Sequence, residues 1–281
     1  MDDPDELVFN HVRMELLKCG TNAIPFLEQS WEHDIYGLVF QNRIESVLHD
    51  IQFENIQSLL KQWINSSDKD LLQGAIIIAQ YQYPGLDENL VHQYINQLKK
   101  DIWLELNDQM TAFEKVKVFN KIFFELHGYH GDNKNYYSPV NSYINTVLES
   151  KKGNPLSLGV VYSYVAQLLD IPIYGVNLPN HFVLAYIDEN GSNYFLEDSN
   201  EFGVLFYINV FSKGSILNEK EIKEFLSEIN IDYKRDYFEP CSNSSIIERM
   251  IINLIYSFKQ VGNKNKIDEL FVLKELLNPA Q

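Results

Sequence analysis

Apolar residues recur at helical spacing through the first third of the chain, from Glu6 to about Leu106. The recurring apolar pairs include Leu16-Leu17, Leu38-Val39, Val47-Leu48, Leu59-Leu60 and Trp63-Ile64. Short polar stretches such as Ser66-Ser67-Asp68 separate them. We predict four or five short amphipathic helices, packed either as a HEAT-like solenoid or as a plain bundle, because the repeat has no fixed consensus.

The pattern changes after Gly153. Asn154 can cap a helix and Pro155 suits its first position, so we predict a helix from there to about Leu169. Continuous or alternating apolar runs then predict strands at 173–176, 181–187, 194–196 and 204–208. Helical spacing returns at 219–229, 246–261 and 266–277.

Helices followed by a small antiparallel sheet and then by more helices are typical of the α+β class rather than the α/β class. The same pattern suggests where the chain divides. We predict a helical region at 1–108, a central domain at 109–235 and a closing helix pair at 236–281 that packs on the core.

Charge and cysteine content narrow the function classes. The net charge of −16 repels phosphate backbones, so we expect no nucleic-acid partner. Cys19 and Cys241 are too few and too far apart for a disulfide framework or a cysteine-rich zinc site, so we expect reduced thiols. No apolar stretch approaches the roughly 20 residues that a membrane span needs. We therefore expect a cytoplasmic protein with no membrane partner and no cofactor.

Three sequence blocks in the central region carry a family resemblance. They are Gly128-Tyr129-His130-Gly131-Asp132-Asn133, Gly153-Asn154-Pro155-Leu156-Ser157-Leu158 and Gly175-Val176-Asn177-Leu178-Pro179-Asn180-His181-Phe182. In this order and spacing they resemble the SirB1 family, bacterial proteins whose central domain belongs to the transglutaminase-like superfamily. A related domain occurs in some eukaryotic F-box proteins. The resemblance implies a papain-like central helix packed on a small antiparallel sheet.

The resemblance also implies where a catalytic site would lie. Active members of the superfamily use a cysteine at the start of the central helix, a histidine on a strand and an Asp or Asn on the next strand. His181 and Asn209 match the second and third positions, as a remnant dyad, although the family's acidic residue is an amide here. Pro155 occupies the cysteine position, and proline has no nucleophile.

Other residues near this site have weaker claims. Ser157 lies two positions after Pro155, roughly 200° around the helix, so we regard it as a poor candidate nucleophile and a better capping residue. We expect Asn154, Pro155, Asn177 and Asn180 to line the cleft. His127 and His130 have metal-like spacing, but turn glycines beside them favour a structural role, and we predict no metal site.

Three functions remain open. We favour a transglutaminase-like protein that has lost its cysteine nucleophile and binds a protein or peptide. The first alternative is a hydrolase or acyltransferase that uses an unidentified nucleophile with His181 and Asn209. The second is a structural helical adaptor in which the central domain is a spacer.

Overall fold

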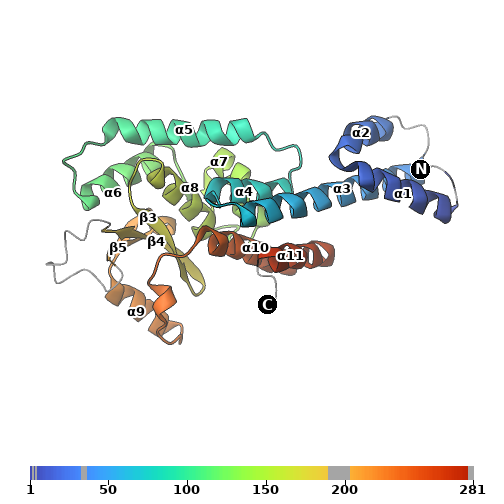
Figure 1. The fold of residues 1–281 in the computed structure, drawn as a ribbon. Helices are drawn as coiled ribbons and strands as arrows, with labels where there is room; N and C mark the ends of the chain where they lie inside the picture. The colour runs from blue at the N-terminus through green and yellow to red at the C-terminus, as the bar shows by residue number, and fades with distance from the viewer. Residues whose placement is uncertain (2, 4, 33–36, 189–202, 278–281) are drawn as a thin grey trace.

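The structure is a computed structural model that describes residues 1, 3, 5–32, 37–188 and 203–277. Its first part is helical, and Figure 1 shows these helices running from an outlying N-terminal end into the body of the protein. They are α1 (Glu6–Cys19), α2 (Ile24–Glu32), α3 (Leu38–Asn65), α4 (Leu71–Gln80) and α5 (Glu88–Glu105). None of the helices in the described ranges is both long enough and apolar enough to cross a membrane.

One of these helices differs from our expectation of short elements. α3 continues for 28 residues from Leu38 to Asn65, because no glycine or proline interrupts it. Its first half packs with α1 and α2 around Ile44 and Val47, in a small core of their own. Its second half enters the main core through Leu60 and Trp63. The single long helix therefore joins the outlying N-terminal helices to the rest of the molecule.

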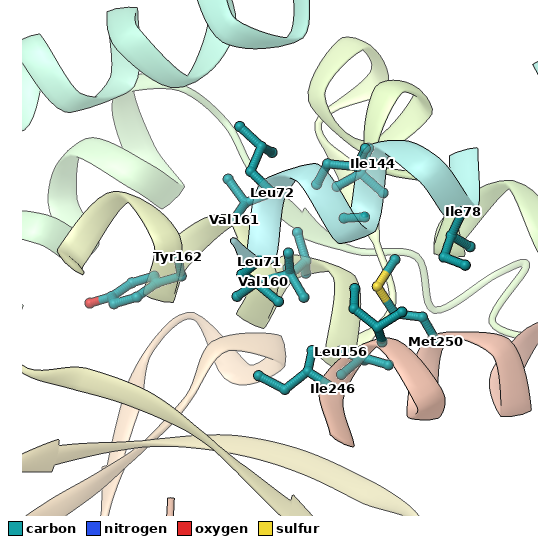
Figure 2. Close-up of a cluster of buried hydrophobic side chains, with 14 of the residues drawn as sticks. Leu71, Leu72, Ile78, Ile144, Leu156, Val160, Val161, Tyr162, Ile246 and Met250 are labelled. Atoms are coloured by element: carbon teal, nitrogen blue, oxygen red, sulfur yellow. The ribbon is translucent and has the colours of Figure 1, made fainter. Parts of the chain in front are cut away.

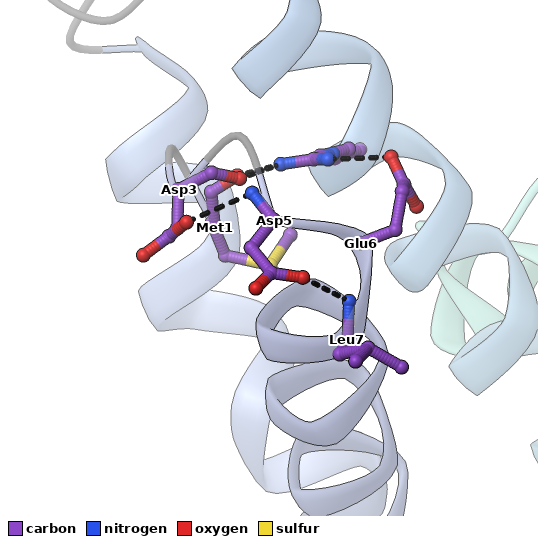
Figure 3. A network of polar contacts seen from close by, with 6 residues as sticks. Met1, Asp3, Asp5, Glu6 and Leu7 are labelled. Atoms are coloured by element: carbon purple, nitrogen blue, oxygen red, sulfur yellow. Dashed lines mark hydrogen bonds and ion pairs between the residues drawn. The ribbon is translucent and has the colours of Figure 1, made fainter.

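Polar contacts fasten the start of α1 to α3. The carboxylate of Asp5 accepts a hydrogen bond from the Leu7 N–H at 2.8 Å and so caps α1. Arg43 on α3 donates to the carbonyl oxygens of Met1 and Asp3 and pairs with Glu6 at 2.7 Å. Figure 3 shows this network around the beginning of the helix.

The sheet is antiparallel, in the order β3-β4-β5-β6, which confirms the predicted α+β class. Its strands are β3 (Ile173–Leu178), β4 (His181–Ile187), β5 (Val204–Asn209) and β6 (Ser215–Leu217). Leu178 pairs with His181 across the β3–β4 turn, and Leu184 pairs with Ile208 across β4 and β5. The strand predicted at 194–196 lies outside the described residues.

The helix α8 (Pro155–Gln167) lies at the centre, and eleven of its residues are buried. It packs on β3 and β4, where Gly159 and Gly175 approach the ring of Phe182 so closely that an added Cβ would lie 2.7 and 2.6 Å from it. Figure 2 shows side chains of α8 meeting those of α4 and α10, among them Leu72, Val161 and Met250. α8 is therefore fixed from several sides.

The remaining elements surround this centre. They are α6 (Ala112–Asn120), the π-helical turn Lys121–Leu126, β1 (His130–Gly131), α7 (Ile144–Ser150), β2 (Lys152–Gly153), α9 (Glu219–Glu228), α10 (Asn243–Gln260) and α11 (Lys264–Leu277). α9 covers the face of the sheet opposite α8, through Ile222 and Leu226 against Val176 and Val183. α10 and α11 form the closing helix pair predicted from the sequence.

The contact of α4 with α10 gives a stability prediction. An added Cβ at Gly74 would lie 2.8 Å from Ile247 and 2.9 Å from Trp63, both buried. We expect Gly74→Ala to lower the free energy of unfolding by about 1–3 kcal/mol, although alanine is the better helix former. Gly85→Ala is the control, because no atom lies within 4 Å of its added Cβ. Urea unfolding measures both, and equal stability of the two variants would contradict this packing.

Candidate functional site

A tight hairpin presents His181. Leu178 and His181 form the last pair of β3 and β4, and Pro179-Asn180 make the turn between them. Asn180 has φ of 58°, a left-handed conformation that asparagine tolerates better than most residues. His181 is thus the first residue of β4, half-buried, with its ring 6.0 Å from that of Phe225 on α9.

The end of this hairpin is held by an arginine from a distant helix. The Nη2 atom of Arg249 on α10 donates to the carbonyl oxygen of Leu178 at 3.1 Å and to that of His181 at 3.4 Å. The arginine thus contacts the backbone of both residues that close the hairpin. The contact joins the closing helix pair to the histidine strand.

The start of α8 is fixed by a capping box. The Asn154 side chain accepts from the Ser157 N–H at 2.9 Å, and the Ser157 hydroxyl accepts from the Asn154 N–H at 3.0 Å. The same hydroxyl donates to the carbonyl oxygen of Asn141 at 2.6 Å, and the Asn154 amide donates to Ser142. Ser157 is 1% exposed and is engaged with backbone groups, without a hydrogen bond to His181. Its geometry is that of a capping residue.

Pro155 and His181 line the same cavity, of about 500 Å³. Asn154 and Asn180 also line it, as predicted cleft residues, whereas Asn177 is absent from its lining. The other lining residues come from four segments: Tyr136, Tyr137, Leu156, Phe182, Arg249, Ile252, Asn253, Tyr256 and Ser257. The cavity thus lies between the start of α8, the hairpin end and one face of α10.

A second hollow, of about 380 Å³, lies on the other side of the hairpin end. His181 and Asn180 line both hollows, and Asn209 lines this one. The Asn209 side chain lies close enough to the imidazole of His181 to raise its pKa, and it accepts from the Ser212 N–H at 3.2 Å. The two residues matched to a remnant dyad therefore both line the second hollow, and His181 also reaches the first.

The electrostatic surroundings keep His181 neutral. Burial lowers the pKa of its imidazole below the ordinary value of 6.5, and the nearby positive charge of Arg249 lowers it further. The side chain of Asn209 acts in the opposite direction, because its oxygen stabilises the N–H groups of the charged ring. A neutral imidazole can accept a proton, which is the property a general base needs.

Neither cysteine is among the described residues that line the two hollows. Cys241 lies beside β3, where its backbone N–H donates to the Gly175 carbonyl at 2.8 Å. Burial raises the pKa of its thiol to about 12, so it stays protonated at neutral pH. Cys19 is exposed at the end of α1.

The two histidines with metal-like spacing make separate local contacts. His127 pairs with Asp101 at 2.9 Å, and the Nδ1 atom of His130 lies 2.8 Å from the carbonyl oxygen of Gly128. In the described ranges, no three His, Cys, Asp or Glu side chains gather in a way that could hold a metal ion.

Sequence reasoning did not identify Arg249 or the aromatic rim of the cavity as a set. Arg249, Ile252, Asn253 and Tyr256 recur at helical spacing, so the sequence indicates that they share one face of a helix. It gives no sign of what this face meets. Arg249 lies at the cavity because it hydrogen-bonds the carbonyls of His181 and Leu178, which are 68 and 71 residues away in the sequence.

Comparisons with known proteins agree with this arrangement. Residues 89–252 match a family model described as the transglutaminase-like superfamily. A UPF0162 protein of Xylella fastidiosa is 32% identical over 178 residues, which are 60% of this chain and 57% of that protein. F-box only protein 21 of Mus musculus is 23% identical over 259 residues, 91% of this chain and 37% of that protein. The chain thus spans a little over half the length of the Xylella relative. No solved structure was found to match it.

The capping box predicts the effect of removing one hydroxyl. Ser157→Ala takes away the acceptor for the buried Asn154 N–H and the donor to Asn141, so we expect a loss of roughly 2 kcal/mol in the free energy of unfolding. Ser163→Ala is the control, because that buried hydroxyl donates to carbonyls of its own helix, those of Gly159 and Val160. Chemical denaturation compares them, and an equal loss in both would contradict the capping role.

The surroundings of His181 predict how its titration responds to substitution. NMR titration of the imidazole should give a pKa below 6.5. Arg249→Gln should raise this pKa, whereas Asn209→Ala should lower it, because the first removes a repelling charge and the second a hydrogen bond to the imidazolium. Shifts in the same direction would contradict the arrangement.

The same shift has a consequence for stability. The folded protein holds the proton of His181 less tightly than the unfolded chain does. The contribution of His181 to stability is therefore complete above the unfolded pKa of 6.5 and decreases as the pH falls below it. Chemical denaturation of the wild type and of His181→Gln between pH 5 and 8 measures this contribution to the free energy of unfolding.

Proposed function

The chain belongs to the transglutaminase-like superfamily, and we propose that it is a non-catalytic member of SirB1 type that binds a protein or peptide in the cavity beside His181. The observation that carries this proposal is the position of Pro155. It is the first residue of α8 and lines the same cavity as His181. In active members, the thiol nucleophile occupies the start of this helix.

Proline removes two catalytic groups at once. It has no side-chain atom that can attack a carbonyl, and it has no backbone N–H. Acyl-transfer enzymes commonly use the N–H of the nucleophilic residue as one donor of the oxyanion hole. An intermediate formed here would lack both the attacking atom and that donor. His181 and Asn209 are then a general base and its partner without a nucleophile to activate.

The hydroxyls near the site do not replace the thiol. Ser157 is already engaged by Asn141 and Asn154. Ser257 and the three tyrosines of the lining belong to other elements, and no hydrogen bond joins any of them to His181 among the described contacts. The protonated thiol of Cys241 lies outside the lining. These observations favour binding over the alternative of an enzyme with an unidentified nucleophile.

The cavity itself supports a binding role. Its volume of about 500 Å³ falls within the usual range for ligand pockets. Tyr137 and Tyr256 are exposed at its edge, with ring centroids 5.3 Å apart. Tyrosine suits recognition surfaces because it offers an apolar ring and a polar hydroxyl at low entropic cost. A central domain that served only as a spacer would need no such hollow.

The relatives are compatible with a binding unit. The match to mouse F-box only protein 21 covers 91% of this chain but 37% of that protein. A region resembling nearly the whole of this chain is therefore joined there to other segments. Binding modules are commonly used in this way, whereas the identity of a partner for this chain is left to experiment.

Restoring a thiol tests the assignment of the nucleophile position. In Pro155→Cys, the new thiol would lie at the N-terminus of α8 and beside His181, and both lower the pKa of a thiol. We expect iodoacetamide to modify it at pH 6.5 at least about tenfold faster than the thiol of Pro139→Cys. Pro139 is also the first residue of a helical turn, but it is not in the cavity lining. Peptide mapping by mass spectrometry separates these sites from Cys19 and Cys241.

Two results would contradict the proposal. One is that iodoacetamide modifies Pro155→Cys and Pro139→Cys at the same rate, and that adding His181→Ala does not change the rate. The first position of α8 would then not be a nucleophile position. The other is turnover by the wild type. Incubation with a glutamine-containing peptide and a primary amine should give no covalent product and no ammonia, and a product that His181→Ala abolishes would identify an enzyme.

A further inference from the structure

Arg249 has unused hydrogen-bonding capacity inside the cavity. Its Nη2 atom makes both bonds to the hairpin carbonyls. Its Nε and Nη1 atoms have no acceptor in the described part of the chain, and no carboxylate there forms an ion pair with it. A guanidinium group has five N–H donors, so most of its donors remain available to a ligand.

This charge is partly withdrawn from water. Arg249 lines the cavity, and burial lowers the pKa of its guanidinium from its ordinary value, although arginine stays charged in proteins. A half-buried cation without a counter-ion is unfavourable, and an anion in the cavity would offset that cost. Tyr136 and Cys241, the titratable groups that act on the pKa of its guanidinium, are neutral at pH 7 because burial raises the pKa of both.

One backbone donor belongs to a residue of the same lining. The first turn of a helix leaves backbone N–H groups without partners and carries a partial positive charge. Asn154 caps the N–H of Ser157, whereas the N–H of Leu156 has no acceptor among the described residues. Leu156 lines the cavity together with Arg249. The interior of the cavity is therefore suited to an anion.

The rim beside this charge is apolar and aromatic. Tyr137 and Tyr256 are about half exposed, Ile252 is 40% exposed, and all three line the cavity with Arg249. Tyr136 packs edge-on against Tyr137, with ring centroids 5.0 Å apart. The cavity thus combines an arginine that has no counter-ion among the described residues with an aromatic surface on which an apolar side chain can pack.

We propose that this cavity holds the C-terminal carboxylate of a bound peptide, which accepts a hydrogen bond from Nε or Nη1 of Arg249, with the last side chain against Tyr137, Tyr256 and Ile252. The inference rests on the proposed function, since it names what the peptide presents to the cavity. A hydrogen bond from a guanidinium group to a carboxylate is charge-assisted and is roughly twice as strong as one between neutral groups.

The charge of the whole protein favours a chain end over an acidic segment. With a net charge of −16, the protein repels a peptide that carries several carboxylates. A C-terminus brings one carboxylate in any sequence, and the same carbon atom carries the last side chain. That arrangement matches a single cation beside an aromatic wall in a cavity of about 500 Å³.

A set of short peptides tests the inference. The probes are acetylated tetrapeptides that begin Gly-Ser-Ala and end in each apolar amino acid in turn, as free acids and as C-terminal amides. A third kind has an amidated end and one internal glutamate. We expect at least one free acid to bind at least about tenfold more tightly than its amide, by saturation-transfer NMR and calorimetry.

A charge placed beside Arg249 provides the matched variant. Asn253 lies four residues after Arg249 on α10 and lines the cavity. Asn253→Asp would pair with the guanidinium and repel the ligand without removing the bonds from Arg249 to the hairpin. We expect it to weaken binding of the free acid by at least about tenfold and to leave the amide unchanged. Asn263→Asp adds the same charge at an exposed position outside the cavity and should change neither.

The outcomes separate this inference from the proposed function. If the free acid and the amide bind equally and Asn253→Asp has no effect, the inference that the cavity binds a C-terminal carboxylate is wrong. The proposal that the cavity binds a peptide would still stand. If the amidated peptide with an internal glutamate binds tightly, the group recognised is an acidic side chain and not a chain end. That result would overturn the inference. No binding by any of the peptides would overturn both.

Discussion

The burial of α8 is the constraint on which the rest of the site depends. The eleven buried residues of α8 include its whole first turn, so the polar groups at its N-terminus need partners from the protein rather than from water. The Asn154–Ser157 capping box does this, and its link to Asn141 ties the helix start to the preceding segment. The cavity exists where this fixed end meets the hairpin that carries His181.

The fold does not need the nucleophile. Close contacts of Gly159 and Gly175 with Phe182, and the cap at Asn154, determine how the helix meets the sheet. A proline satisfies the first position of a helix as well as a cysteine does, or better, because it lacks the N–H that would have no partner there. A transglutaminase-like core can therefore keep its shape, its histidine and its cavity while the proposed chemistry changes from acyl transfer to binding.

Local sequence signals predicted local structure well. Asn154-Pro155 predicted the start of α8, and apolar runs predicted β3, β4 and β5. The predicted length of α3 was wrong, because we divided the periodic pattern at polar residues that do not break a helix. Arg249 was missed for a different reason. Its position at the cavity depends on carbonyl groups 68 and 71 residues away, and nothing in the local pattern encodes that meeting.

Arg249 contributes to both the structure of the site and its proposed ligand binding. It hydrogen-bonds the end of the histidine strand and keeps other donors free for a ligand. The most direct measurement is a crystal structure of the wild-type protein grown with its tightest-binding peptide. The account predicts an intact, non-covalently bound peptide in the cavity between Pro155, His181 and Arg249. A cleaved or covalently attached peptide would contradict it, as would an empty cavity with the peptide bound to the N-terminal helices.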